Sequence, residues 1–158
     1  MKNGKSCEAC SGLGLVLVRG LLGSVLLLAG YQKFAAPGGA SAWATDHLSQ
    51  AQGYLSASLA NLYVHAVPFA EVALGGLLVV GLMTRASGLV AALLLTSFGI
   101  ASGGLHGFFN TDYTSASQLF QAPFVYGVLA LVALFAGPGA ISLDRLLFGG
   151  RKATRERT

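Results

Sequence analysis

The chain has 158 residues and a formal net charge of +4; 54% of its residues are hydrophobic and only 10% are charged. An ordinary soluble domain carries about 25% charged residues, so this composition nearly excludes a soluble globular enzyme, and the mean hydropathy of +0.66 excludes a disordered chain. The basic residues gather beside apolar stretches, so nucleic acid is not an expected partner.

Four apolar stretches approach the roughly 20 residues that a helix needs to cross the hydrocarbon core of a bilayer. None shows strand-like alternation, and a helix satisfies its backbone polar groups within itself, so we predict four helices. The predicted fold class is therefore all-α, an integral membrane four-helix bundle whose last span is the shortest. The spans run from Leu13 to Phe34, Tyr63 to Met83, Ala86 to Leu105 and Pro123 to Gly137.

The Lys and Arg residues predict the orientation of this bundle. Lys2 and Lys5 precede the first span, Arg85 lies between the second and third, and further basic residues follow the fourth, whereas residues 35–62 and 106–122 contain no Lys or Arg. By the positive-inside rule both termini are cytoplasmic and both long loops are external. We expect a cytoplasmic N-terminal tail at 1–12, the four-span membrane domain at 13–140, and an interfacial helix with a basic cytoplasmic tail at 141–158.

The first external loop is predicted to contain a helix of its own. Leu48, Leu55, Leu59 and Leu62 recur at helical spacing among polar residues. This pattern favours a short amphipathic helix that lies on the outer membrane surface.

Three ionisable residues lie within or at the ends of the predicted spans: Arg19, Lys33 and Glu71. Such groups cost about 2.5–3.5 kcal/mol at a helix centre and usually face a partner or a water-filled cavity. Antiparallel packing of the first two spans would bring Glu71 between Arg19 and Lys33, with Gly23 and Gly30 allowing close approach. Two interpretations stay open. Glu71 neutralises a cation so that the spans pack, or the three residues form a site for a proton or a quinone head.

The histidines and cysteines offer other chemistry. His65 and His106 are expected at similar depth near the outer ends of two spans, where they could ligate a haem iron or serve as interfacial polar residues. Cys7 and Cys10 form a C-x-x-C before the first span. A closed zinc site needs four ligands, and the histidines are predicted near the opposite side, so one chain provides no such metal site. A reduced dithiol, a site shared between protomers, a partner contact and two thiols in a flexible tail remain alternatives.

Four segments resemble the DoxX family of small bacterial membrane proteins: Arg19–Gly23, Ala29–Phe34, Pro68–Gly76 and Gly81–Arg85. The resemblance implies a four-helix bundle in the bacterial inner membrane, in a family that includes subunits of thiosulfate:quinone oxidoreductases. Arg19, Lys33, Glu71 and Arg85 match its recurrent polar residues.

The function expected from these observations is that of an accessory or membrane-anchor subunit of a quinone-linked oxidoreductase complex, rather than an enzyme by itself. The expected partners are the lipid bilayer, other subunits of the complex and, as an alternative, further copies of this chain. A quinone is the one cofactor this function suggests. The alternatives are a haem-carrying electron-transfer bundle and a small-solute transporter, and four short helices without an inverted repeat give little room for alternating access.

Overall fold

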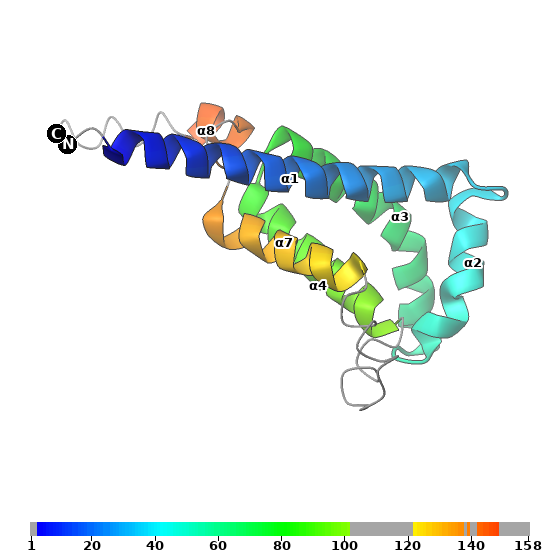
Figure 1. Cartoon of the computed structure of the whole chain (residues 1–158). Helices are drawn as coiled ribbons and strands as arrows, with labels where there is room; N and C mark the ends of the chain where they lie inside the picture. Colours follow the sequence, from blue (N-terminus) through cyan, green and yellow to red (C-terminus); the bar gives the residue numbers. More distant parts are fainter. Residues whose placement is uncertain (1–2, 102–121, 138, 140–141, 149–158) are drawn as a thin grey trace.

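The structure is a computed structural model that describes residues 3–101, 122–137, 139 and 142–148. Within these residues every regular element is a helix, which confirms the all-α prediction (Figure 1). The helices are α1 (Asn3–Ala35), α2 (Gly39–Gln52), α3 (Ala57–Val80), α4 (Thr84–Ala101), α7 (Ala122–Ala136) and α8 (Leu143–Phe148).

The predicted spans are recovered as helices, but all four begin earlier than expected, the first two by several residues. Helix α1 begins at Asn3, so most of the predicted tail at 1–12 belongs to the first helix. Helix α3 begins at Ala57 instead of Tyr63 and ends at Val80, and Gly81, which follows it, adopts a left-handed conformation with φ 74°. Glycine adopts that conformation without steric cost, which explains the helix end.

The loop between the first two spans does contain a helix of its own, α2, but the prediction that one helix carries all four leucines from Leu48 to Leu62 is wrong. Helix α2 ends at Gln52, and Gly53 and Leu55 donate backbone hydrogen bonds that close a turn after it. A new helix then begins after Ser56, whose backbone is extended. The four leucines therefore do not share one helix: Leu48 lies on α2, Leu55 in the turn, and Leu59 and Leu62 on α3.

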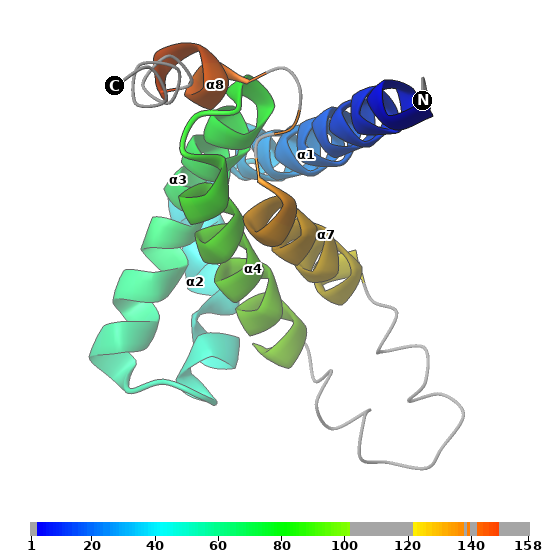
Figure 2. The same cartoon turned by 90° about the vertical axis from the view of Figure 1, so that its left-hand side faces the viewer.

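Helices α1 and α3 pack antiparallel and make the closest helix–helix contact of the fold (Figures 1 and 2). A Cβ atom at Gly75 would lie 2.7 Å from the carbonyl oxygen of Gly23 and 2.6 Å from the backbone nitrogen of Leu27. A Cβ atom at Gly30 would lie 2.7 Å from Cγ2 of Val72. Small residues at these positions let the two backbones approach, as the sequence predicts.

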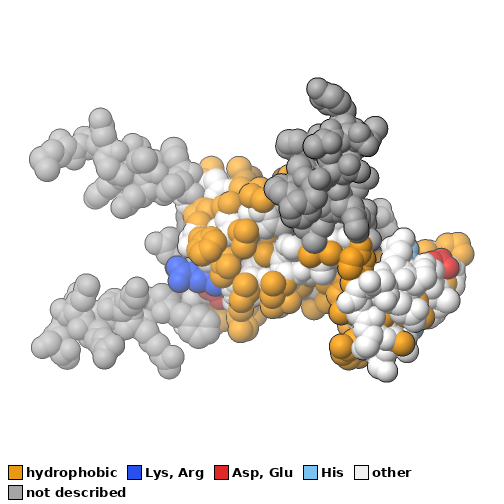
Figure 3. Space-filling model, turned by 90° about the horizontal axis from the view of Figure 1, so that it is seen from below, with side chains coloured by type: hydrophobic (Ala, Val, Ile, Leu, Met, Phe, Trp, Pro, Cys, Tyr) orange, Lys and Arg blue, Asp and Glu red, His pale blue; other side chains and the backbone are white. Residues whose placement is uncertain are grey.

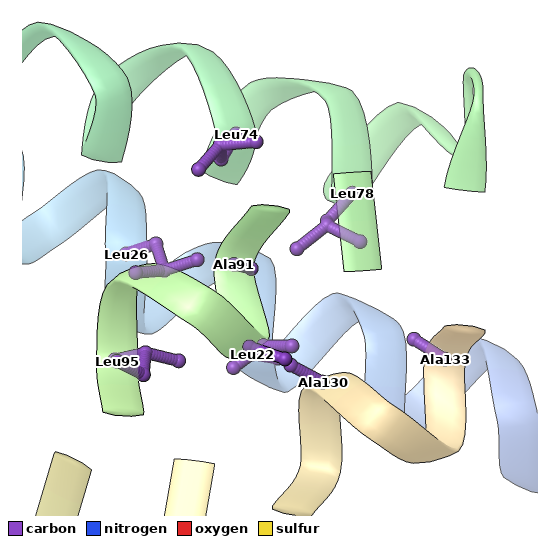
Figure 4. Packing of buried hydrophobic residues seen from close by; sticks show 9 residues of the cluster. Leu22, Leu26, Leu74, Leu78, Ala91, Leu95, Ala130 and Ala133 are labelled. Atoms are coloured by element: carbon purple, nitrogen blue, oxygen red, sulfur yellow. The ribbon is translucent and has the colours of Figure 1, made fainter. Parts of the chain in front are cut away.

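The main core lies where α1, α3, α4 and α7 meet (Figure 4). Leucines from α1 and α3 interdigitate with small residues from α4 and α7, which brings those two helices close to the others. The residues labelled in the figure are Leu22, Leu26, Leu74, Leu78, Ala91, Leu95, Ala130 and Ala133.

A second, smaller core fixes α2 against α3. Ala44 and Ala51 of α2 are buried with Ala60 and Val64 of α3. Helix α2 is therefore a packed part of the molecule, and it covers the end of the bundle at which α1 finishes (Figure 1).

The outward faces of the long helices are apolar. Leu17, Leu93 and Phe135 are 65%, 64% and 77% exposed, and hydrophobic side chains cover much of the surface between the two ends (Figure 3). In the described part of the chain, Gly12–Ala35 and Ala57–Val80 are long and apolar enough to cross a membrane, whereas Thr84–Ile100 and Pro123–Ala136 are shorter apolar helices. Water would disfavour so large an apolar surface and lipid favours it, so the chain is a membrane protein.

Candidate functional site

Lys33 and Glu71 form an ion pair between α1 and α3. Lys33 lies in the last turn of α1, and its Nζ atom donates to Oε1 and Oε2 of Glu71 at 2.7 and 2.6 Å. The side chains are 15% and 3% exposed. The antiparallel packing of the two helices creates this contact, and the pair can be buried because its charges cancel and its carboxylate is hydrogen-bonded.

Aromatic rings from two other helices surround the ammonium group. The Nζ atom of Lys33 lies 4.9 Å from the ring centroid of Trp43 on α2 and 5.9 Å from that of Phe98 on α4. These distances allow cation–π attraction. Trp43 also stacks on His47, one turn later in α2, with ring centroids 4.3 Å apart.

The tautomer of His47 follows from its hydrogen bond. Its Nδ1 atom lies 2.9 Å from the carbonyl oxygen of Trp43. A carbonyl only accepts, so Nδ1 carries the proton, and in the neutral ring Nε2 is an acceptor.

These residues border a cavity of about 310 Å³. This is the lower end of the range for small-molecule sites, which run from about 300 to 1,000 Å³. Its lining combines charged, polar and aromatic groups, and so can hold a small polar group against an apolar wall. The lining residues are Lys33, Trp43, His47, Gln50, Glu71, Phe98 and Pro123.

Arg19 does not join this site, so the predicted cluster of Arg19, Lys33 and Glu71 is divided. Arg19 is 4% exposed and lies against Gly81, where an added Cβ would be 2.2 Å from its Nη1 atom. The separation follows from helix geometry, because Arg19 and Lys33 are about 21 Å apart along α1 at 1.5 Å per residue.

Near Arg19, Asp144 makes a polar contact that was not predicted from the sequence. The Asp144 carboxylate of α8 accepts hydrogen bonds from the backbone N–H groups of Met83 and Thr84 at 2.7 and 2.9 Å. Asp144 therefore caps the start of α4 from a distant part of the chain, and its own N–H donates to the Gly81 carbonyl. Burial alone would raise the pKa of Asp144, but the backbone hydrogen bonds and the charge of Arg19 outweigh it and lower the pKa below the ordinary value.

The haem and cysteine hypotheses are not tested by the structure. His65 is exposed on α3, and its Nδ1 donates to the carbonyl of Asn61 at 2.8 Å; His106 lies outside the described residues. Cys7 and Cys10 lie in α1 and not in an irregular tail, and the structure describes their backbone but not their side chains. Among the described residues, no three His, Cys, Asp or Glu side chains gather in a group that could hold a metal ion.

Trp43, His47 and Gln50 were also missed as site residues. All three lie on α2. Trp43 and His47 are four residues apart, about one helical turn, and this spacing was the only sequence pattern that could have indicated a shared helix face. The sequence of the loop gave no reason to place that turn over Lys33.

Comparison with known proteins identifies the family of this chain. The family described as methylamine utilisation protein MauE matches residues 11–112, more than half of the chain. The chain belongs to the MauE family. The matched region includes α2 and the Lys33–Glu71 pair. No curated protein and no solved structure matches the chain.

Membership of the MauE family corrects the resemblance to DoxX. The segments that suggested DoxX contain helix-packing glycines, one buried carboxylate and basic residues. Close helix packing and the burial of charge in lipid require such residues in many small membrane proteins. They describe the physical setting of the chain and do not identify its family.

Proposed function

We propose that this MauE-family chain is an accessory membrane subunit of a redox system for methylamine utilisation. The family match over residues 11–112 carries this proposal. The exposed apolar faces of α1, α3, α4 and α7 support it, because they suit a bundle that lipid and partner subunits surround. A subunit role also agrees with the motif content, since the sequence contains no phosphate-binding loop or nucleophile elbow.

The proposed arrangement is a four-span bundle in the bacterial inner membrane with both termini in the cytoplasm. The distribution of Lys and Arg supports this orientation. Helices α4 and α7 are short for independent spans, but α4 packs on α7 and both contact the long helices. Reporter fusions test it: fusions at Asn3 and Lys152 are expected to read cytoplasmic, and a fusion within residues 105–122 external. An external C-terminus contradicts four spans.

The finer proposal concerns the cavity beside Lys33 and Glu71. A lipid-soluble redox carrier such as a quinone presents carbonyl oxygens, and Lys33 keeps one N–H beyond the two that bind Glu71. The mixed polar and aromatic lining of the cavity supports such a head group. A purely structural ion pair is the competing explanation, and it predicts that Glu71→Gln changes stability and activity in parallel.

Co-isolation tests the subunit role. The tagged chain is purified in mild detergent from cells grown on methylamine and, as a control, from cells grown on succinate. We expect redox proteins of the methylamine system to be enriched only in the first sample. The proposal is contradicted if the tagged chain co-purifies with the same proteins from both kinds of cells.

A further inference from the structure

A second cavity lies close to the polar one. It has a volume of about 280 Å³ and an almost entirely apolar lining. Its walls come from the end of α2, the turn that follows it, and helices α3 and α4. The lining residues are Ala51, Tyr54, Leu55, Tyr63, Ser97 and Ile100.

Two of the three hydroxyl groups in this wall, those of Ser97 and Tyr63, are already hydrogen-bonded within the protein. The Oγ atom of Ser97 donates to the carbonyl of Leu94 at 2.6 Å, so the Tyr63 hydroxyl is the donor in its hydrogen bond with Ser97. Both hydroxyl protons are therefore used within the protein. The remaining hydroxyl is that of Tyr54, whose side chain is 51% exposed. Because the rest of the lining is almost entirely apolar, the second cavity suits a hydrocarbon chain.

A small cavity of about 40 Å³ shares wall residues with both. It shares Trp43, His47 and Phe98 with the polar cavity, and Ala51 and Tyr63 with the apolar one. The three cavities thus follow one another beneath α2. A ligand that fills them must be polar at one end and apolar at the other.

The polar end favours a neutral head group. Lys33 donates to both carboxylate oxygens of Glu71, and an ammonium group has three N–H bonds, so one remains for a ligand. A carbonyl oxygen can accept that bond and leave the ion pair intact. An anionic head would instead compete with Glu71 for Lys33 and leave a buried carboxylate without its partner.

We infer that α2 covers a binding site for a quinone that carries one hydrocarbon tail. The quinone head lies beside Lys33 and Glu71, and the hydrocarbon tail lies between Leu55 and Ile100. The inference deepens the proposed function, on which it rests for the redox class of the ligand. It gives α2 a role, which is to cover the head and separate it from the aqueous side of the membrane.

Trp43 allows a direct test because it is the single tryptophan of the chain and lines the polar cavity. The purified protein in detergent is titrated with decylubiquinone and with the same benzoquinone head lacking the chain, and quenching of tryptophan fluorescence is measured. We expect saturable quenching by decylubiquinone and at least about tenfold weaker binding of the chainless head, because each buried methylene favours binding.

Two substitutions of alanine residues test the position of the quinone's hydrocarbon tail. Ala51→Leu adds bulk where the small cavity meets the apolar one, and we expect decylubiquinone to bind about tenfold more weakly. Ala57→Leu makes the same change at an exposed position outside the three cavities, and binding is expected to stay within twofold. If Ala51→Leu does not fold, Leu55→Phe narrows the same cavity from the less buried turn and is expected to weaken binding likewise.

A lipid-facing tryptophan separates binding from partition into the micelle. The double variant Trp43→Phe/Leu93→Trp moves the fluorophore to a 64% exposed position, where quenching is expected to rise without saturation. Equal, unsaturated quenching at both positions overturns the inference, as does equal binding of the chainless head. None of these results affects co-isolation with methylamine proteins, so the two proposals fail separately.

Discussion

Removing one partner of the Lys33–Glu71 pair is expected to destabilise the bundle strongly. Glu71→Ala leaves the Lys33 ammonium, which is 15% exposed, without the two hydrogen bonds of 2.6 and 2.7 Å that neutralise it. Breaking a buried pair by removing one partner typically costs about 3–5 kcal/mol. At about 3 kcal/mol the folding equilibrium constant falls more than a hundredfold.

Replacing both partners is expected to cost much less. In Lys33→Met/Glu71→Leu neither charge remains, and a buried pair exchanged for apolar residues of similar size is often neutral in stability. Glu71→Gln should lie between the parent and Glu71→Ala, because the amide oxygen still accepts one hydrogen bond from Lys33. The double variant therefore separates the cost of an isolated charge from the loss of packing.

The assay is unfolding by SDS in mixed micelles, followed by far-UV circular dichroism, for the parent, Glu71→Ala, Glu71→Gln, the double variant and its two single variants, Lys33→Met and Glu71→Leu. The parent, the double variant and these two single variants form a double-mutant cycle, and the coupling energy is expected to favour the native pair. If Glu71→Ala is as stable as the parent, or if the double variant is as unstable as Glu71→Ala, the ion pair does not hold α1 against α3.

Three further predictions concern other parts of the molecule. Gly75→Ala should destabilise by about 1–3 kcal/mol, because the new Cβ would meet the Gly23 carbonyl oxygen at 2.7 Å, while Gly76→Ala, with nothing within 4 Å, should change little; SDS unfolding that ranks the two equally contradicts the close approach. Asp144→Ala should cost about 0.5–2 kcal/mol at neutral pH through loss of the α4 cap. The pKa of Asp144 is lowered in the folded state, so this stabilisation is present above the unfolded pKa of about 3.9 and is lost as the pH falls through the folded pKa. In thermal unfolding, the stabilities of the variant and the parent should therefore become equal in acid and differ at pH 7. Cys7→Ser/Cys10→Ser should leave helix content unchanged by circular dichroism, and loss of a metal that the parent binds would instead indicate ligation across protomers.

The helices of this fold could be predicted because their signals are local. An apolar run of about 20 residues and the glycines at Gly23, Gly30 and Gly75 are visible in the sequence, and the structure places these glycines in the α1–α3 contact. Helix ends were less accurate. The apolar run that defines the first span begins well after Asn3, where the helix itself begins, because a helix can extend beyond its apolar part.

The candidate site could be predicted only in part. Antiparallel packing pointed to a partner for Glu71, but the choice of Lys33 over Arg19 depends on the register of α1 against α3. That register is fixed by contacts such as Gly75 with Gly23, which the sequence does not order. The contribution of α2 was missed because it depends on the packing of α2 over Lys33, which no local pattern indicates. The contact of Asp144 with the start of α4 was missed because it joins residues about 60 positions apart.

The proposed role of the chain in methylamine oxidation through a membrane redox system can be measured in cells. The measurement is methylamine-dependent oxygen uptake in cells that lack the chain, with succinate-dependent uptake as the control. We predict that the deletion lowers only the methylamine-dependent rate, that the parent chain and Gly76→Ala restore it, and that Glu71→Gln, present at parental levels in the membrane, does not. A methylamine-dependent rate that is unchanged by the deletion would contradict the account.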